Sequence, residues 1–289
     1  MVVGGGIAGV QASLDLADAG FYVYLVEKSE AIGGTMAQLD KTFPTNDCSM
    51  CILSPKLVEV DRHPNIQLVT MAQLVGLEGE AGNFKATVVQ EPRYVDPEKC
   101  IACGQCAERC PVKIPDPFNE GVGERKLIGP KYAQAVPSAY AILDPKKCLY
   151  LTKGVETGKP VCRLCEKVCD KGAVNLEDTR KTLTFNVGAV ILAPGFDEFD
   201  PSALANYGYG KFKNVVTSIE FERILSASGP FAGHLVRPSD HKEPKKIAWI
   251  QCVGSRDKAN GSGYCYSVCC TYAIKEAVIA KEPAGEDLD

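Results

Sequence analysis

The sequence lacks a long apolar run, a basic stripe and a secretory leader pattern. A membrane helix needs about 18 or more apolar residues in succession, and the longest apolar stretch, residues 187–196, contains glycine and proline. The formal net charge is -4, and no cluster of lysine and arginine stands out, which argues against a general nucleic-acid or anionic-membrane surface. We therefore expect protein and small-molecule partners, no nucleic acid and no direct membrane insertion.

Histidine is scarce, whereas cysteine is abundant. The 289 residues include three histidines, which no metal-ligand spacing links, and 14 cysteines. The composition, 45% hydrophobic and 24% charged, is typical of a globular protein with about two domains. The chain enters a glycine motif without the basic and apolar regions of a signal peptide. Together with the many cysteines, this predicts a reducing and anoxic cytoplasmic setting.

The densest cysteine pattern is at residues 100–111, which read C-x2-C-x2-C-x3-C-P. This is the bacterial ferredoxin spacing for [4Fe–4S] clusters, in which three thiolates hold one cluster and the fourth reaches a second. A second set downstream repeats the end of this run, although Asp170 replaces the expected proline. The crossed pairing predicts one cluster on Cys100, Cys103, Cys106 and Cys169, and another on Cys148, Cys162, Cys165 and Cys110.

Structural zinc is the main alternative for these thiolates. Zinc sites usually consist of two separated C-x2-4-C knuckles rather than three cysteines at two-residue gaps, so the spacing favours iron–sulfur clusters. A disulfide framework is less favoured still, because nothing in the sequence indicates secretion.

A glycine motif opens the chain. Residues 4–9 read G-x-G-x-x-G after a short apolar strand, a helical pattern follows at residues 10–19, and an apolar strand at residues 21–27 ends in Glu27. This order predicts a dinucleotide site, with Gly4 for the turn, Gly6 for backbone approach to the pyrophosphate, Gly9 for helix packing and Glu27 for the ribose. A generic tight turn between strand and helix is the alternative.

Two further segments favour FAD over NAD by their resemblance to flavoproteins with two dinucleotide domains. Such proteins carry a Gly-Gly turn beside the flavin phosphates, as at Gly33 and Gly34 here, and residues 187–195 resemble their buried strand and A-T-G turn, with Ala193 and Gly195 in that turn. A purely structural turn after that strand is the alternative. Strands at residues 66–70 and 84–90 are expected to complete this domain.

Cysteines outside the ferredoxin pattern form two more groups. Cys48 and Cys51 are either a redox dithiol or two inert buried cysteines, because reactivity depends on local charge and exposure. Cys252 lies in an expected strand and turn at residues 246–255, and Cys265, Cys269 and Cys270 lie in an expected helix that starts near Tyr264. Four thiolates at a helix N-terminus can hold a third [4Fe–4S] cluster where a nicotinamide nucleotide would otherwise lie; packed core cysteines are the alternative.

These elements predict an α/β fold: an FAD-binding, Rossmann-like domain of the thioredoxin-reductase kind with a ferredoxin-like α+β insert. The FAD domain is expected at residues 1–92 and 176–242, the insert with two clusters at residues 93–175, and the start of a second nucleotide-domain-like βα unit with a third cluster at residues 243–289. Residues 111–137 are expected to form a loop, and residues 217–227 a helix. An insert with its own core is expected to need little from its host.

The whole pattern resembles the A subunit of heterodisulfide reductase and the related A-type subunits of quinone-interacting membrane-bound oxidoreductases. The resemblance rests on residues 4–9, 39–44, 48–56 and 252–256, the two ferredoxin runs, and Cys265, Cys269 and Cys270. It implies an FAD-bearing oxidoreductase subunit that exchanges electrons through [4Fe–4S] clusters with the other subunits of its complex; in some members the flavin bifurcates electron pairs. A ferredoxin or hydrogenase-type electron donor and a homodimer are also expected. By the same resemblance, the chain is expected to be truncated at both ends.

Two other functions compete with this one. An NAD(P)H-dependent flavoprotein with a fused ferredoxin domain, similar to the small subunit of glutamate synthase, would place the cluster motif before the flavin motif, whereas here Cys100 follows Gly4. A non-catalytic cluster or zinc scaffold would leave the glycine turn empty. Visible absorption of flavin and iron–sulfur clusters distinguishes the flavoproteins from a colourless zinc scaffold.

Overall fold

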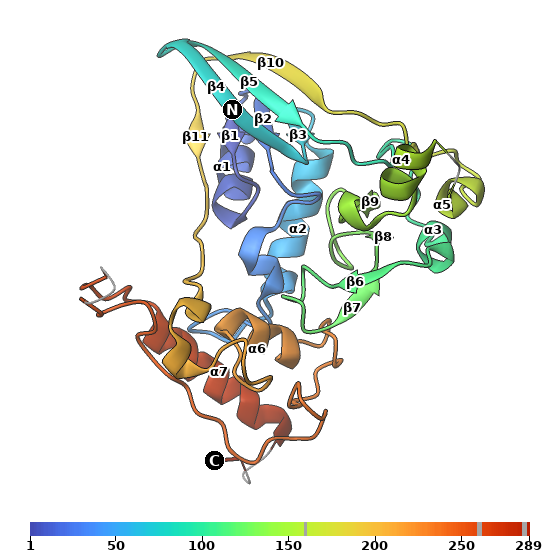
Figure 1. The fold of residues 1–289 in the computed structure, drawn as a ribbon. Coiled ribbons are helices and arrows are strands. Elements are labelled where there is room, and N and C mark those ends of the chain that lie inside the picture. Colours follow the sequence, from blue (N-terminus) through green and yellow to red (C-terminus); the bar gives the residue numbers. More distant parts are fainter. Residues whose placement is uncertain (159–160, 259–261, 285–287) are drawn as a thin grey trace. The chain divides into compact units, whose positions relative to one another are not determined.

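The computed structural model describes residues 1–158, 161–258, 262–284 and 288–289 (Figure 1). Contacts divide the chain into two compact units. Unit 1 comprises Met1–Ala37, Ile52–Pro115 and Glu124–Gly195, and unit 2 comprises Gln38–Cys51, Asp116–Gly123 and Phe196–Asp289. The division into three domains by sequence stays a prediction.

A parallel sheet forms the first part of unit 1. Its strands follow the order β11-β1-β2-β3 and comprise β1 (Val2–Val3), β2 (Val23–Val26), β3 (Ile66–Val69) and β11 (Ile191–Leu192). Helix α1 (Ile7–Asp18) connects β1 to β2 and buries Val10 and Leu14. The predicted strand, helix and strand around the glycine motif are therefore confirmed, and so is the strand at residues 66–70.

An antiparallel sheet forms the second part of unit 1. Strands β4 (Ala72–Glu80), β5 (Asn83–Gln90) and β10 (Lys181–Val187) lie side by side with β5 in the centre (Figure 1). The predicted strand at residues 84–90 is confirmed as β5. The sequence analysis missed β4, most of whose residues are exposed or half-buried and which contains two glycines, so its sequence has no clear apolar alternation.

The prediction of one buried strand starting at residue 187 is wrong in its extent. Strand β10 ends at Val187, and the two-residue strand β11 begins only at Ile191. Ile191 and Leu192 are 39% and 68% exposed, although they pair with β1. Strand β11 lies at the edge of the parallel sheet, so its side chains have a neighbouring strand on one side alone.

The predicted insert forms a small core of its own within unit 1. Its elements are α3 (Gln105–Arg109), β6 (Lys113–Pro115), β7 (Glu124–Lys126), β8 (Ile128–Gly129), β9 (Ala141–Ile142), η2 (Pro145–Lys147), η3 (Tyr150–Gly154), α4 (Val155–Thr157) and α5 (Leu164–Lys167). Strand β6 pairs with β7 and β8 with β9, both antiparallel. The predicted loop at residues 111–137 is therefore wrong in part, because it contains three of these strands. The buried residues of the core include Val95, Ile114, Ile128, Ile142 and Val174.

Unit 2 contains α6 (Ser218–Leu225), α7 (Cys269–Ala284), η4 (Pro201–Ala203) and η5 (Ala205–Tyr207). Two other helices cross the unit boundaries, η1 (Gly34–Gln38) and α2 (Ser49–Arg62), and the sequence analysis predicted neither. The predicted helix near residues 217–227 is confirmed as α6, whose first turn Thr217 and Glu220 close with a capping box. No helix of the described ranges combines the length and apolarity that crossing a membrane requires.

The expected strand at residues 246–255 is wrong for the described structure, since residues 246–252 adopt no strand conformation. The indole Nε1 of Trp249 instead donates to Glu276 on α7 at 2.9 Å. The expected helix is present but begins at Cys269 rather than Tyr264, because Ser267 has a left-handed φ of 64°. The second βα unit therefore has its helix without its strand.

Candidate flavin site and candidate iron–sulfur centres

The glycine motif packs closely against β11 and α1. Gly4 has a φ of +106°, and a Cβ at this position would lie 2.0 Å from the carbonyl oxygen of Ala193. A Cβ at Gly9 would lie 1.8 Å from the oxygen of Gly4. Both contacts are shorter than any side chain tolerates, so strand, turn and helix can approach this closely with glycine alone.

The Gly-Gly turn lies directly against the same motif. The N–H of Gly33 donates to the oxygen of Gly5 at 2.7 Å, and a Cβ at Gly34 would lie 2.8 Å from the Cα of Gly6. Gly6 caps α1 without a side-chain hydrogen bond. Helix N-termini bind phosphate through their free N–H groups. At this helix N-terminus the neighbouring residues are glycines, which place no side chain of their own beside the N–H groups.

Glu27 directly follows β2 and is 8% exposed. One carboxylate oxygen, Oε2, accepts from the N–H of Gly5 at 2.6 Å, and the other, Oε1, accepts from the N–H and Oγ of Ser29 at 2.8 and 2.7 Å. A carboxylate offers about four lone-pair positions, so the three donors leave one for a ribose hydroxyl. Gly195, also predicted here, has no heavy atom within 4 Å of a built Cβ and is not part of this close packing.

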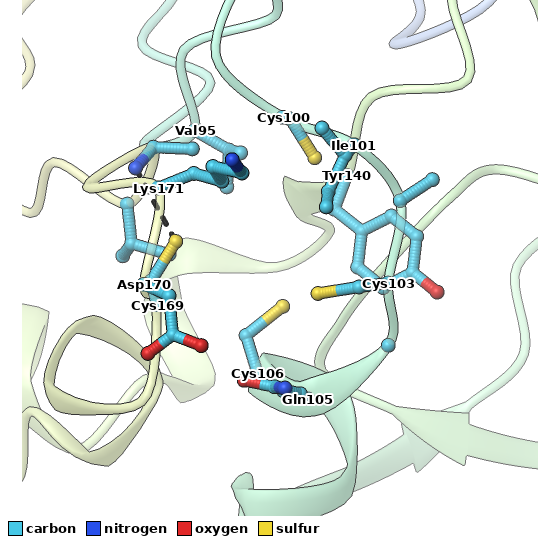
Figure 2. A pocket seen from close by; sticks show the side chains of 14 residues that line it. Val95, Cys100, Ile101, Cys103, Gln105, Cys106, Tyr140, Cys169, Asp170 and Lys171 are labelled. Carbon is cyan, nitrogen blue, oxygen red and sulfur yellow. Dashed lines mark hydrogen bonds between the residues drawn. The ribbon is translucent and has the colours of Figure 1, made fainter.

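One cavity of about 110 Å³ is lined by Cys100, Cys103, Cys106 and Cys169. Figure 2 shows their sulfur atoms directed toward a common space, beside Val95 and Tyr140. The left-handed residues Ala102 and Gly104 bend the chain around this space, and the N–H of Ala173 donates to the sulfur of Cys169 at 3.3 Å. A cavity of this size takes a group of several atoms, since a single water needs about 10–15 Å³ by the same measure.

The thiols of this cavity influence each other's protonation. The pKa of Cys106 is raised to about 11, mainly by burial, and the neighbouring Cys100, Cys103 and Cys169 contribute to this shift. Negative charge on four thiolates therefore requires cations between them. Iron supplies such charge, because metal coordination replaces the thiol proton, and the residues present fit a cluster of this kind.

A second cavity, of about 30 Å³, is lined by Cys110, Cys148, Cys162 and Cys165. Cys110 and Cys148 are buried on the core of the insert. Burial raises the pKa of Cys165 to about 12, with Cys148, Cys110 and Cys162 adding to the shift. The eight cysteines of the insert thus line two cavities in the two predicted sets of four; their role as iron ligands stays a prediction.

The third predicted set is less compact. Cys265 and Cys270 are exposed, and Cys252 and Cys269 are half-buried. The sulfur of Cys265 accepts from the N–H of Ser267 at 3.3 Å, and that of Cys252 lies 4.0 Å from a guanidinium nitrogen of Arg256. In the part of the chain that the structure describes, no three His, Cys, Asp or Glu side chains of any set lie close enough to share a single metal ion.

Cys48 and Cys51 form a disulfide at the start of α2. The N–H of Cys51 donates to the sulfur of Cys48 at 3.2 Å. The pair is thus joined, and its redox activity stays a hypothesis.

Comparison with known proteins finds similarity in both the glycine-motif segment and the first cysteine run. Residues 1–48 match the family model for an FAD dependent oxidoreductase, and residues 93–116 match that for a 4Fe-4S binding domain. The chain is 47% identical over 282 residues to the iron-sulfur A subunit of CoB–CoM heterodisulfide reductase from Methanocaldococcus jannaschii, covering 98% of this chain and 41% of that protein. This chain is a relative of the heterodisulfide reductase A subunits.

Two further A subunits show the same range of similarity. The A subunit numbered 2 from Methanopyrus kandleri is 51% identical over 99% of this chain and 42% of its own length. The ferredoxin/F(420)H(2)-dependent A subunit from Methanosarcina acetivorans is 41% identical over 98% of this chain and 34% of its own length. The chain therefore spans about two fifths or less of these A subunits. Among solved structures, L-proline dehydrogenase from P. horikoshii is 24% identical over 31% of this chain and 18% of its own, with a TM-score of 0.28.

The sequence analysis missed two residues, Tyr132 and Arg93, that contact the segment around the Gly-Gly turn, here called the flavin turn. Tyr132 is 8% exposed, and its hydroxyl donates to the oxygen of Ile32, beside Gly33. Burial is the main cause that raises its pKa, and the nearby Glu27 adds to it. Arg93 is 7% exposed and reaches the oxygen of Glu30 in the same turn. These residues are 63 to 100 positions away from their partners, and no local motif marks them.

Proposed function

We propose that this chain is the flavin- and cluster-bearing part of an oxidoreductase subunit of the heterodisulfide-reductase type. FAD would supply exchange of electron pairs, and the [4Fe–4S] clusters would pass electrons singly to and from partner subunits. The observation that carries this proposal is the presence, within unit 1, of a glycine-lined phosphate cradle and two cavities each lined by four cysteines.

The residues of the cradle have distinct roles in this proposal. Gly6 and Gly34 let the pyrophosphate approach the backbone at the N-terminus of α1, whose N–H groups hold it. Glu27 accepts from the adenosine ribose, and its bonds to Gly5 and Ser29 keep its carboxylate oriented. Ala193 closes the cradle against Gly4.

The two cysteine cavities would shield the charge of a bound cluster from water. Val95, Tyr140 and Val174 line the first cavity, and Leu127, Ile142 and Leu176 line the second. Apolar surroundings of this kind limit solvent access and so help to set the reduction potential of a cluster. We assign Cys100, Cys103, Cys106 and Cys169 to one cluster, Cys148, Cys162, Cys165 and Cys110 to the other, and Cys252, Cys265, Cys269 and Cys270 to a third.

The partners follow from the names of the relatives. Several are described as ferredoxin reductases or as ferredoxin-dependent A subunits, and a subunit requires a complex. We propose that this chain receives electrons from a ferredoxin or hydrogenase-type donor, works with other subunits in the cytoplasm and pairs as a homodimer. Electron bifurcation at the flavin belongs to the same proposal.

Anaerobic purification followed by visible spectroscopy and iron counting tests this function. We expect flavin bands, broad iron–sulfur absorption and at least eight irons per chain, because each [4Fe–4S] cluster contains four. A colourless protein with zinc would support the scaffold alternative. Rapid flavin reduction by NADPH in the isolated chain would support the NAD(P)H-dependent alternative instead.

A further inference from the structure

The insert reaches into the flavin site through residues 130–140, here called the arm. The N–H of Ile32 donates to the oxygen of Val136 at 2.8 Å, and the hydroxyl of Tyr132 donates to the oxygen of Ile32. Lys131 Nζ donates to the Oγ of Ser29 at 2.7 Å. The arm therefore bonds both backbone groups of Ile32, the residue directly before the Gly-Gly turn.

The contact between arm and turn is buried. Ile32 is fully buried, and Val136, Ala135 and Tyr132 are 7%, 4% and 8% exposed. A Cβ built on Gly33 would lie 2.5 Å from the hydroxyl of Tyr132. The turn that borders the flavin cradle is thus shaped on one side by the insert; the expectation that the insert needs little from its host stays a prediction.

Arg93 joins this contact to the cysteine cavity. On the flavin side its guanidinium donates to the oxygen of Glu30 and to the Oγ1 of Thr70, the latter at 2.7 Å. On the arm side it donates to the oxygens of Ala139 and Tyr140 at 3.1 and 3.5 Å. One planar cation therefore holds two segments of the host and one of the insert, a geometry that the guanidinium fork allows and an ammonium group does not.

The arm side of this link ends at the first cysteine cavity. Tyr140, whose carbonyl Arg93 contacts, lines that cavity together with Val95, two residues after Arg93 (Figure 2). Burial lowers the pKa of Arg93, and the charges of Glu30 and Cys100 oppose this shift. The charges of Arg93 and Cys100 therefore favour each other, and a low local dielectric screens such an interaction little.

We propose that Arg93 is a positioning residue that couples the flavin turn to the cluster held by Cys100, Cys103, Cys106 and Cys169. This inference rests on the proposed function. Assembly of the cluster orders the insert, the arm then holds Ser29 to Gly33, and FAD binds a turn that is already ordered. Linkage requires the reverse effect of equal size: bound FAD stabilises the cluster.

The test compares FAD affinity with and without the first cluster, in wild type and in Arg93→Met. Cys103→Ala removes the cluster in each background, and the cluster-free to cluster-loaded ratio of FAD dissociation constants is measured by flavin fluorescence. In wild type we expect loss of the cluster to raise the FAD dissociation constant about tenfold, within the usual range of coupling. In Arg93→Met we expect the two dissociation constants to be nearly equal, a ratio near one. The exposed Arg180, paired with Glu91, supplies the control: Arg180→Met should keep the wild-type ratio.

A second readout separates charge from geometry. The first cluster should have a lower reduction potential in Arg93→Met, because a buried positive charge nearby favours the reduced and more negative state. Arg93→Lys should retain most of that potential yet lose the FAD coupling. If Arg93→Met does not fold, Thr70→Val removes one flavin-side acceptor and should reduce the ratio without changing the charge.

The outcomes distinguish this inference from the proposed function. A chain that holds neither flavin nor iron contradicts both. A chain that holds both, with a wild-type ratio near one or an unchanged ratio in Arg93→Met and Thr70→Val, contradicts the coupling alone.

Discussion

Units 1 and 2 differ in how their chemical groups are held. In unit 1, eight cysteines line two cavities next to a continuous apolar core, and the flavin turn is held by Arg93 and Tyr132. In unit 2, the four cysteines of the third predicted set lie in irregular segments and at the start of α7, and two of them are exposed. Unit 2 also buries an ion pair, in which Lys275 Nζ donates to Glu222 and to the oxygen of Lys41. The contrast is therefore one of support: the eight cysteines of unit 1 lie against an apolar core, whereas two of the four in unit 2 are exposed.

The largest expected effect is at the flavin cradle of unit 1. Gly34→Ala should lower FAD affinity more than 100-fold, because its Cβ would lie 2.8 Å from the Cα of Gly6. The matched control is Gly20→Ala, which has the same left-handed strain, with a φ of +90°, but no atom within 4 Å. Flavin content of the purified variants is the measurement. Equal flavin loss in both variants would contradict the cradle and leave backbone strain as the explanation.

The next largest effect concerns the cysteine cavities of unit 1. Cys165→Ala should remove one cluster, about four irons per chain, because Cys165 lies among the three other thiols of its cavity. Cys51→Ala is the matched control, since Cys51 is joined to Cys48 in a disulfide. Iron analysis with low-temperature EPR measures both. Unchanged iron in Cys165→Ala would show that the second cavity holds no cluster.

A cysteine substitution in unit 2 tests whether its cysteines differ from those of unit 1 when the cofactors are bound. Cys269→Ser should lower iron from about twelve toward eight per chain if the third cluster forms. Because two of its four cysteines are exposed, we also expect this cluster to be lost first to a chelator in the intact protein. A third cluster that resists chelation as well as those of unit 1 would break the comparison.

The smallest effect concerns the buried charge of unit 2. Glu276 is 1% exposed, its Oε2 accepts from Trp249, and its Oε1 has no hydrogen-bond partner among the described residues. Burial raises its pKa to about 8, and the nearby Glu222 adds to the shift, although Lys275 opposes it. The native pKa lies above the unfolded value of about 4.3. The protonated Glu276 therefore adds fully to the stability of the folded state at low pH, and this stabilisation is progressively lost as pH rises to about 8.

Glu276→Gln should therefore flatten the fall in thermal stability between about pH 5 and 8, by a few degrees at the upper end. The melting temperature across this range measures it. Glu282→Gln, a half-exposed acid on the same helix that pairs with Lys41, should leave the slope unchanged. A slope that is identical in wild type and Glu276→Gln would show that Glu276 is already ionised in the folded protein.

Local sequence patterns predicted many elements of this molecule, because the residues that define those elements are close together in the sequence. The glycine motif and its helix involve neighbours within about one turn, and the two ferredoxin runs repeat one spacing, so their elements and groupings follow from sequence order. The α6 helix was equally local, with Thr217 and Glu220 at its start. The ligand assignments themselves stay predictions.

Long-range contacts explain what the sequence did not predict. Arg93 binds the oxygen of Glu30, 63 residues earlier, and that of Ala139, 46 residues later, and no motif encodes such a pair. The apolar residues before Cys252 resembled a strand, yet Ile247 bonds Asp289 through its N–H and Trp249 bonds Glu276. Ile247 and Trp249 are half-buried against a cluster that includes α7 residues, and Ile250 is 58% exposed. These residues therefore pack without a sheet, and the period of the sequence alone does not separate the two cases.

The most direct test of the account is to follow electrons between the flavin and the clusters within the intact chain. The bound flavin is reduced by light in the anaerobic protein, and absorption is recorded at flavin and cluster wavelengths. The two time courses report electron transfer from flavin to cluster. The account predicts that reduced flavin decays as cluster absorption bleaches, and that Cys106→Ser slows or abolishes the transfer. A flavin that stays reduced beside fully oxidised clusters would contradict the electron-transfer function.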